Sequence, residues 1–93
     1  MKKSTTIFNN QVEFIHFLKS KFPLYHMSNI FFRDIHYGVI EYLNSKKIHV
    51  TYTEAESIAR EVAQSFEKQN ILRKVNSQGW VLHYPEFTAK KAS

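Results

Sequence analysis

The chain contains no cysteine, which excludes a disulfide framework, a thiolate zinc site and a cysteine nucleophile. It has only two glycines and two prolines in 93 residues, so long irregular loops have little room and a compact, helix-rich domain is expected. No apolar run approaches the roughly 18 residues that a membrane-spanning helix needs. Asn9-Asn10-Gln11 also interrupts the apolar segment near the basic start. We therefore expect neither a signal peptide nor membrane insertion, and a cytoplasmic location.

Catalytic and cofactor motifs are missing as well. There is no glycine-rich phosphate loop, no Gly-x-Ser-x-Gly element and no pair of carboxylates with the pattern of an active site. The five histidines include no pair at i,i+4 spacing, the spacing that places two imidazoles on one face of a helix. We expect a non-catalytic protein without a metal or a cofactor.

Positive charge is in excess, but it is concentrated at the termini. The net charge of +5 suggests an anionic partner. Four of the lysines lie in terminal segments, and without them nine basic residues face eight acidic ones. These four are Lys2, Lys3, Lys90 and Lys91.

Apolar residues recur at helical spacing in three segments. The first runs from Asn10 to Phe22, with Asn10 as N-cap and Glu13 as its capping-box partner, and Pro23 ends it. The polar residues 1–6 before it are expected to form a flexible tail.

The second helix is predicted to begin with Ser28 or Asn29 as its cap and to run to about Ser45. Its apolar residues cover about half of the circumference at ~100° per residue. This breadth predicts packing on two sides or contact with a partner. Gly38 inside the helix indicates close backbone packing, because glycine there costs roughly 1 kcal/mol relative to alanine.

Residues 48–52 alternate apolar and polar, which is typical of a short strand or of an extended connector. The third helix is predicted over 54–69, with Thr53 as N-cap and Glu56 as its capping partner. Asn70 stands where a helix needs a left-handed terminating residue.

The chain then passes into two strands, 71–75 and 80–84, joined by the polar turn 76–79. The predicted fold class is α+β: a three-helix bundle with a C-terminal β-hairpin. One domain is expected over 7–87, followed by a flexible tail over 88–93.

This order of elements resembles that of winged-helix proteins, over roughly residues 10–87. The similarity is strongest in "FEKQNILRKVNSQGWVLHY", because the third helix of many winged-helix proteins ends in Glu-Lys-x-Gly, followed by Ile-Leu, a turn and an aromatic strand. Asn70 here replaces that glycine, and the connector Lys46–Tyr52 is longer than the turn of a standard helix-turn-helix. The resemblance implies a DNA-binding protein that regulates transcription.

A second similarity is to DEP domains, winged helices that bind membranes and receptor tails. "YTEAESIAREV" looks like the start of their third helix, although the helix predicted here is about one turn longer. This resemblance implies a protein-interaction module without DNA binding.

The third helix has a polar face opposite its apolar one. Its net charge is −2, but its four glutamates fall on the flanks of that face. Arginine and glutamine can pair with base edges, whereas lysine and serine can hold phosphates. Further basic residues in the hairpin and before the helix would contact the DNA backbone. The predicted double-stranded DNA contacts are Ser57, Arg60, Gln64 and Lys68, with Arg73, Lys74, Lys46 and Lys47.

The same residues also have a plain structural explanation. Glu56 and Arg60 are i,i+4 neighbours and would form an ordinary surface pair. Fourteen aromatic residues in so small a domain favour, in addition, an exposed apolar surface for a homodimer or for a protein partner. Phe17, Phe31 and Tyr42 are the residues predicted for that surface, unless terminal aromatics fold over them and leave a monomer.

Overall fold

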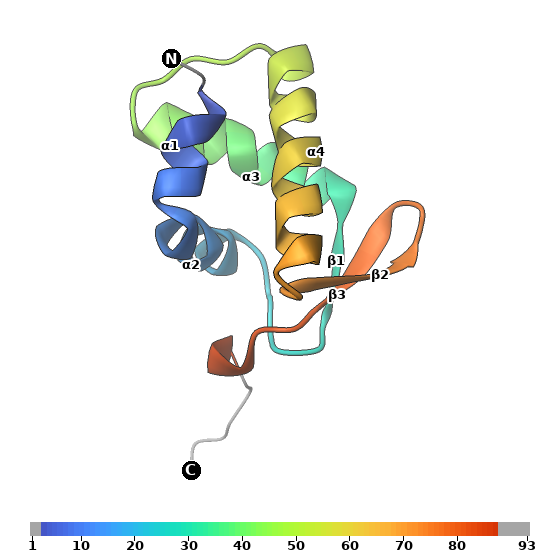
Figure 1. Ribbon diagram of the computed structural model, residues 1–93. Helices are drawn as coiled ribbons and strands as arrows, with labels where there is room; N and C mark the ends of the chain where they lie inside the picture. Colours follow the sequence, from blue (N-terminus) through green and yellow to red (C-terminus); the bar gives the residue numbers. More distant parts are fainter. Residues whose placement is uncertain (1–2, 88–93) are drawn as a thin grey trace.

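The computed structural model describes residues 3–87, and the predicted tail 88–93 lies outside the described residues (Figure 1). No helix of the described part combines the length and the apolar character needed to cross a bilayer. The helices are α1 (Ser4–Asn9), α2 (Gln11–Lys21), α3 (Phe32–Ser45) and α4 (Tyr52–Lys68). The strands are β1 (Asn29–Phe31), β2 (Leu72–Asn76) and β3 (Gly79–Leu82), and a 3-10 turn η1 (Pro85–Phe87) follows.

The three strands form one antiparallel sheet in the order β1-β3-β2. Ile30 is paired with Trp80 across β1 and β3, and Arg73 with Val81 across β2 and β3. Figure 1 shows the sheet at one end of the helices, with the hairpin β2-β3 projecting sideways from the end of α4. The predicted α+β class with a C-terminal hairpin is confirmed, and the arrangement is winged-helix-like.

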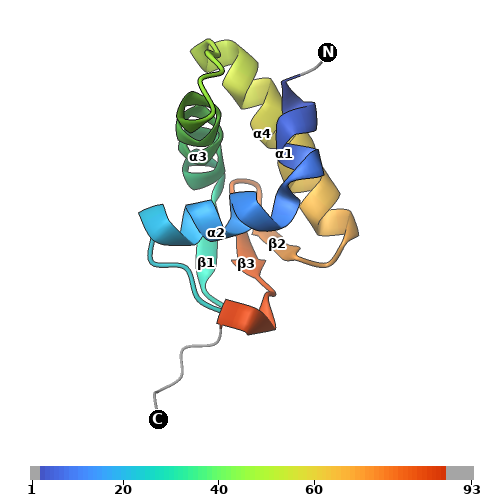
Figure 2. The same cartoon turned by 90° about the vertical axis from the view of Figure 1, so that its left-hand side faces the viewer.

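The core lies between α2, α3 and α4. Phe14 of α2 meets the ring of Tyr42 edge-on, with 5.3 Å between ring centroids, and lies 6.4 Å from Phe66 of α4. Figure 2 shows α2 running across the lower end of α3, with α1 beside α4. Within residues 3–87 the bundle thus has four helices, because α1 packs on α4 beside the three predicted ones.

Residues 4–6 of the predicted flexible tail belong to α1. Ser4 and Ile7 are buried, and the Lys3 ammonium donates to the Glu54 carboxylate and to the His49 carbonyl. The prediction of a flexible tail over 1–6 is therefore wrong for residues 3–6. The polar run Ser-Thr-Thr gives no sign of this helix in the sequence, and of its apolar residues Ile7 is buried while Phe8 is only partly buried against the core.

Asn10 is the N-cap residue of α2 as predicted, but the predicted capping box does not form. Asn10 precedes the helix, yet its side chain makes no capping bond and donates instead to the Thr6 carbonyl of α1. Glu13 accepts a hydrogen bond from the Tyr42 hydroxyl at 2.6 Å. Asn10 is thus used by a local bond to α1, and Glu13 by a tertiary contact with α3.

The start of α3 lies later than predicted. Residues 29–31 form β1 instead of the first helical turn, and Ser28 bonds within a turn to the backbone of Tyr25. Phe31 is the N-cap residue, and its backbone N–H donates to Asp34 at 3.1 Å. Ser28 and Asn29 were therefore wrong as caps.

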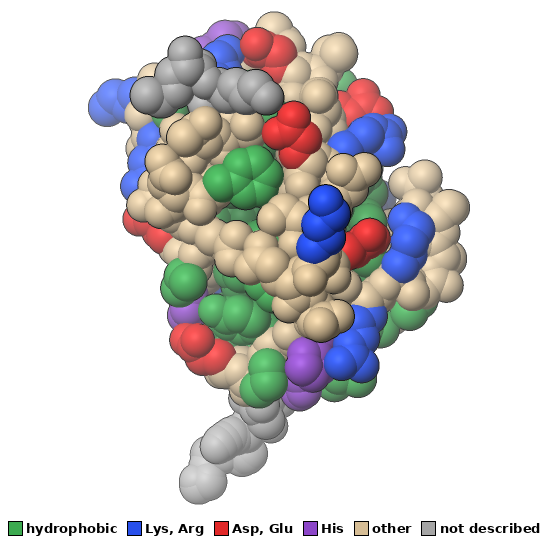
Figure 3. All heavy atoms as spheres, viewed as in Figure 1, with side chains coloured by type: hydrophobic (Ala, Val, Ile, Leu, Met, Phe, Trp, Pro, Cys, Tyr) green, Lys and Arg blue, Asp and Glu red, His purple; other side chains and the backbone are tan. Residues whose placement is uncertain are grey.

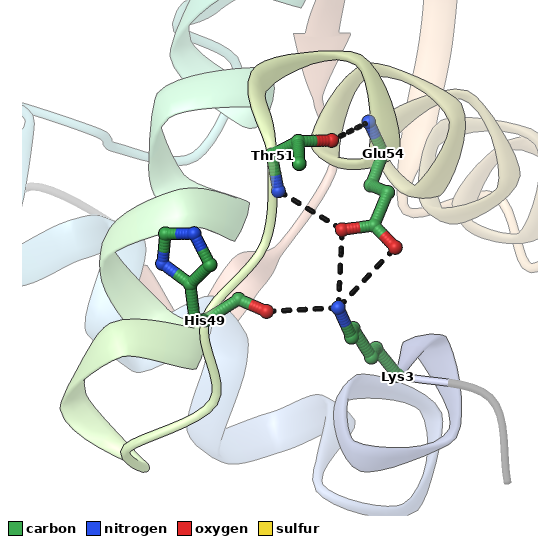
Figure 4. Close-up of polar contacts among 4 residues, drawn as sticks. All are labelled: Lys3, His49, Thr51 and Glu54. Atoms are coloured by element: carbon green, nitrogen blue, oxygen red, sulfur yellow. Dashed lines mark hydrogen bonds and ion pairs between the residues drawn. The ribbon is translucent and has the colours of Figure 1, made fainter.

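The capping box of α4 lies two residues earlier than predicted. Thr51 accepts from the backbone N–H of Glu54, and the Glu54 carboxylate accepts from the backbone N–H of Thr51. Lys3 joins the same carboxylate (Figure 4). Thr53 is an ordinary residue of the helix, so it was wrong as a cap. Residues 48–50 form an extended connector and not the alternative short strand.

The end of α4 and the hairpin confirm the prediction. Asn70 has φ of 64°, the left-handed conformation expected of a terminating residue. The chain enters β2 two residues later and returns through β3. The strand predicted to extend to Tyr84 ends at Leu82, because the chain then turns into η1.

Candidate nucleic-acid interface

A cleft of about 300 Å³ lies between α4 and the hairpin. It brings together Arg60 and Gln64 of α4 with Lys74 of β2, three of the residues predicted to contact DNA. Phe32, at the start of α3, closes one side. The remaining lining residues are Ala63, Glu67, Ser77, Gln78 and Trp80.

The Arg60 guanidinium has two neighbours. It donates to the Glu56 carboxylate at 2.9 Å, which confirms the predicted i,i+4 pair. Its central carbon also lies 4.8 Å from the centroid of the Phe32 ring, a cation–π distance. The side chain of Arg60 is still 63% exposed, so the ion pair does not bury it.

Lys74 and Trp80 form the opposite wall. The Lys74 ammonium lies 4.9 Å from the centroid of the indole ring. The indole N–H donates to the Glu67 carboxylate, which ties β3 to α4. Glu67 is the carboxylate in the cleft lining, and this hydrogen bond holds it beside Trp80.

Unpaired positive charge is found beside the cleft. Four cationic side chains within residues 3–87 have no hydrogen bond, ion pair or ring contact: Arg33, Lys47, Lys68 and Arg73. Three of them belong to the start of α3, the end of α4 and β2, the elements that border the cleft. Figure 3 shows blue groups over the lower part of α4 and over the hairpin, with a red group among them.

The other predicted DNA contacts are placed differently. Ser57 and Lys68 are exposed on α4 but do not line the cleft. Lys46 pairs with Glu13 at 3.0 Å, and Lys47 lies in the connector before α4, at the end away from the hairpin. The structure therefore does not bring Lys46 and Lys47 to the cleft.

Comparison with protein-family models, with curated proteins and with solved structures gave no match. What the cleft can do therefore follows from its own side chains. A guanidinium, an ammonium and two carboxamides (Gln64 and Gln78) offer hydrogen-bond donors, while the only carboxylate in the lining is already bonded to Trp80. Such a set suits an anionic ligand with planar polar edges.

The predicted partner surface is only partly present. Tyr42 is 1% exposed and donates its hydroxyl to Glu13, so it was wrong as a surface residue. Phe17 is half-buried and packs on the Tyr42 ring, with 5.4 Å between centroids. Phe31 is 45% exposed, beside Arg33 and Gln78 in a second, shallower hollow. Phe31 also packs over Gly79, where a Cβ would lie 3.1 Å from its ring.

Phe32, Glu67 and Trp80 belong to the cleft although the polar-face argument did not select them. Glu67 follows Gln64 by three residues and Arg60 by seven, so helical spacing alone places it near them. Phe32 and Trp80 had no such signal, because their sequence pattern indicates only core packing. Within residues 3–87, no three histidine, aspartate or glutamate side chains gather as metal ligands would.

Proposed function

We propose that this protein is a cytoplasmic, non-catalytic regulator that binds double-stranded DNA through α4 and the hairpin. The observation that carries the proposal is the shared cleft, in which Arg60 and Gln64 of the helix face Lys74 of the hairpin. These residues are 10 to 14 positions apart in the sequence, and the hairpin alone brings them together.

The dimensions suit this role. Helix α4 has 17 residues and is about 25 Å long at roughly 1.5 Å per residue. The diameter of an α-helix with its side chains matches the width of the major groove, which is about 12 Å. With α4 in the groove, the cleft would straddle a phosphate strand, Arg60 and Gln64 would face base edges, and Lys74 and Arg73 would contact phosphates.

The acidic residues near the cleft are compatible with this arrangement. Glu56 bonds to Arg60 and Glu67 bonds to Trp80, so neither carboxylate is left without a hydrogen-bond donor. Lys68 at the end of α4 and Arg73 next to Lys74 in β2 have no acidic partner within residues 3–87.

The test is a DNA-binding titration at two salt concentrations. Because each phosphate contact releases counterions, Lys74→Ala should weaken binding to every duplex alike and reduce the salt slope by about one unit. Lys47→Ala is the matched control: it removes an unpaired, exposed lysine at the other end of α4 and should leave the slope unchanged. Failure to bind duplex pools at low salt would remove the proposal.

A second candidate function is a protein-interaction module, which includes a homodimer. It is favoured by large side chains left in solvent: Phe31, Tyr37 and Tyr52 are 45%, 44% and 61% exposed. Exposed patches of this kind often mark interfaces. A stoichiometric protein partner together with absent DNA binding would select this function. A sedimentation mass that stays monomeric on tenfold concentration would exclude the dimer.

A further inference from the structure

The guanidinium of Arg60 is held in a defined orientation before any ligand arrives. Its central carbon lies over the Phe32 ring, 4.8 Å from the centroid, and Glu56 accepts from one terminal nitrogen at 2.9 Å. These two contacts come from different elements, α3 and α4. A surface arginine without such contacts would lose more rotamer entropy on binding.

The contacts leave most of the hydrogen-bonding capacity of Arg60 free. A guanidinium has five N–H donors in one plane, and Glu56 uses one of them. The Phe32 ring makes a cation–π contact and offers these N–H groups no lone pair. The remaining donors lie along the edge of a side chain that is 63% exposed at the mouth of the cleft.

Guanine is the base whose major-groove edge fits such a group. It presents two acceptors, O6 and N7, side by side, and an arginine can bond both at once. Adenine presents one acceptor beside a donor, thymine presents one acceptor, and cytosine presents only a donor.

We infer that Arg60 selects guanine in the bound duplex, and that Phe32 and Glu56 are positioning residues for this selection. The inference rests on the proposed DNA binding and adds the base that the site prefers. Lys74 and Arg73 contact phosphate and contribute to affinity for all sequences alike.

The experiment begins with duplexes selected from a randomised pool by the full-length protein. In the enriched site, each guanine in turn is replaced with 7-deazaguanine, which keeps O6 and base pairing but lacks the N7 acceptor. Binding is measured by fluorescence anisotropy. At one guanine position the wild-type protein should lose affinity about fivefold or more, because half of a bidentate contact is removed.

Variants then assign the effect to Arg60 and to its orientation. Arg60→Ala removes every donor to the guanine edge, so it should bind natural and 7-deaza duplexes with equal affinity. Phe32→Leu removes the ring and should reduce the discrimination, whereas Phe32→Tyr keeps the ring and should retain it. Glu56→Ala should reduce the discrimination without loss of total binding. Arg73→Ala, the matched control, should weaken both duplexes alike and keep their ratio.

The outcomes separate this inference from the proposed function. Salt-dependent duplex binding that is indifferent to every 7-deaza substitution would overturn the inference and leave DNA binding standing. Discrimination that persists in Arg60→Ala, or in a folded Phe32→Leu protein, would also overturn it. If Phe32→Leu does not fold, the discrimination measured for Arg60→Ala and Glu56→Ala still tests the inference. Absence of duplex binding at low salt would overturn both the inference and the proposed function.

Discussion

Gly38 stands where α3 packs on α2, and its missing side chain makes room for Leu18. A Cβ at this position would overlap Cδ2 of Leu18, and the ring of Phe14 lies behind it. This contact is the close backbone packing that the glycine indicated in the sequence, and it explains why a poor helix former occupies the middle of a buried helix.

Gly38→Ala should destabilise the protein by about 1–3 kcal/mol, because an extra methyl group in a filled core forces its neighbours to move. In an open helix the same change would stabilise the protein by about 1 kcal/mol. The sign of the change in the free energy of unfolding therefore shows whether Gly38 is closely packed. Urea unfolding measures it. The double variant with Leu18→Ala should show favourable coupling between the two sites in a double-mutant cycle. A more stable Gly38→Ala protein would contradict the packing.

Asn70 has a backbone requirement of another kind, since its φ is 64°, in the left-handed region that Met27 and Lys47 also occupy. Asn70→Ala should cost about 1 kcal/mol, because a Cβ is unfavourable in the left-handed region and alanine lacks the local hydrogen bonds of asparagine. Asn70→Gly should not carry this cost. The free energies of unfolding of the two variants give the comparison, and equal values would show that the conformation costs nothing here.

At the scale of the element, α4 shows how a helix start is chosen between two local signals. Thr51 with Glu54 and Thr53 with Glu56 have the same spacing, two residues apart. The structure uses the first pair, where Lys3 of the N-terminal segment also bonds to Glu54. A contact 51 residues away in the sequence thus supports one of two equivalent caps.

Thr51→Ala should lower the free energy of unfolding by about 1 kcal/mol, because it removes the acceptor for the backbone N–H of Glu54. Thr53→Ala is the matched control: the same chemical change, two residues later, on an exposed position inside the helix. It should be neutral or slightly stabilising. Equal losses in the two variants would mean that the helix start is not set by this cap.

At the scale of the whole molecule, two carboxylates link separate helices and make stability depend on pH. A hydrogen bond from Tyr42, and then one from Lys46, lowers the pKa of Glu13 below its ordinary 4.5. The backbone N–H of Thr51, and then Lys3, lowers the pKa of Glu54 in the same way. Burial raises the pKa of the Tyr42 hydroxyl, which therefore stays protonated and donating in acid.

Both carboxyl pKa values are lower in the folded than in the unfolded state, so the unfolded chain binds more protons in acid. Their contribution to stability should be fully present above about pH 5 and should be lost as the pH falls through the lowered folded values. Urea midpoints measured from pH 6 down to pH 3 test this. Tyr42→Phe, which removes the donor to Glu13, should show a smaller loss of stability over that range. An unchanged loss would exclude the Tyr42 bond as a cause.

The sequence by itself determined the features that depend on neighbouring residues. Helical spacing of apolar residues predicts three helices, Asn70 predicts the end of α4, and the polar turn between β-forming segments predicts the hairpin. The polar face of α4 likewise predicts Arg60 and Gln64 as exposed residues. All of these follow from local periodicity and backbone preference.

The tertiary structure alone decided the rest. Residues 29–31 become a strand because β3, some 50 residues later, offers a pairing edge, and Tyr42 is buried because Glu13 of another helix accepts its hydroxyl. The cleft exists because the hairpin places Lys74 opposite α4. Each of these outcomes depends on the free energy of a contact between segments distant in the chain, and local sequence preference carries no information about such contacts.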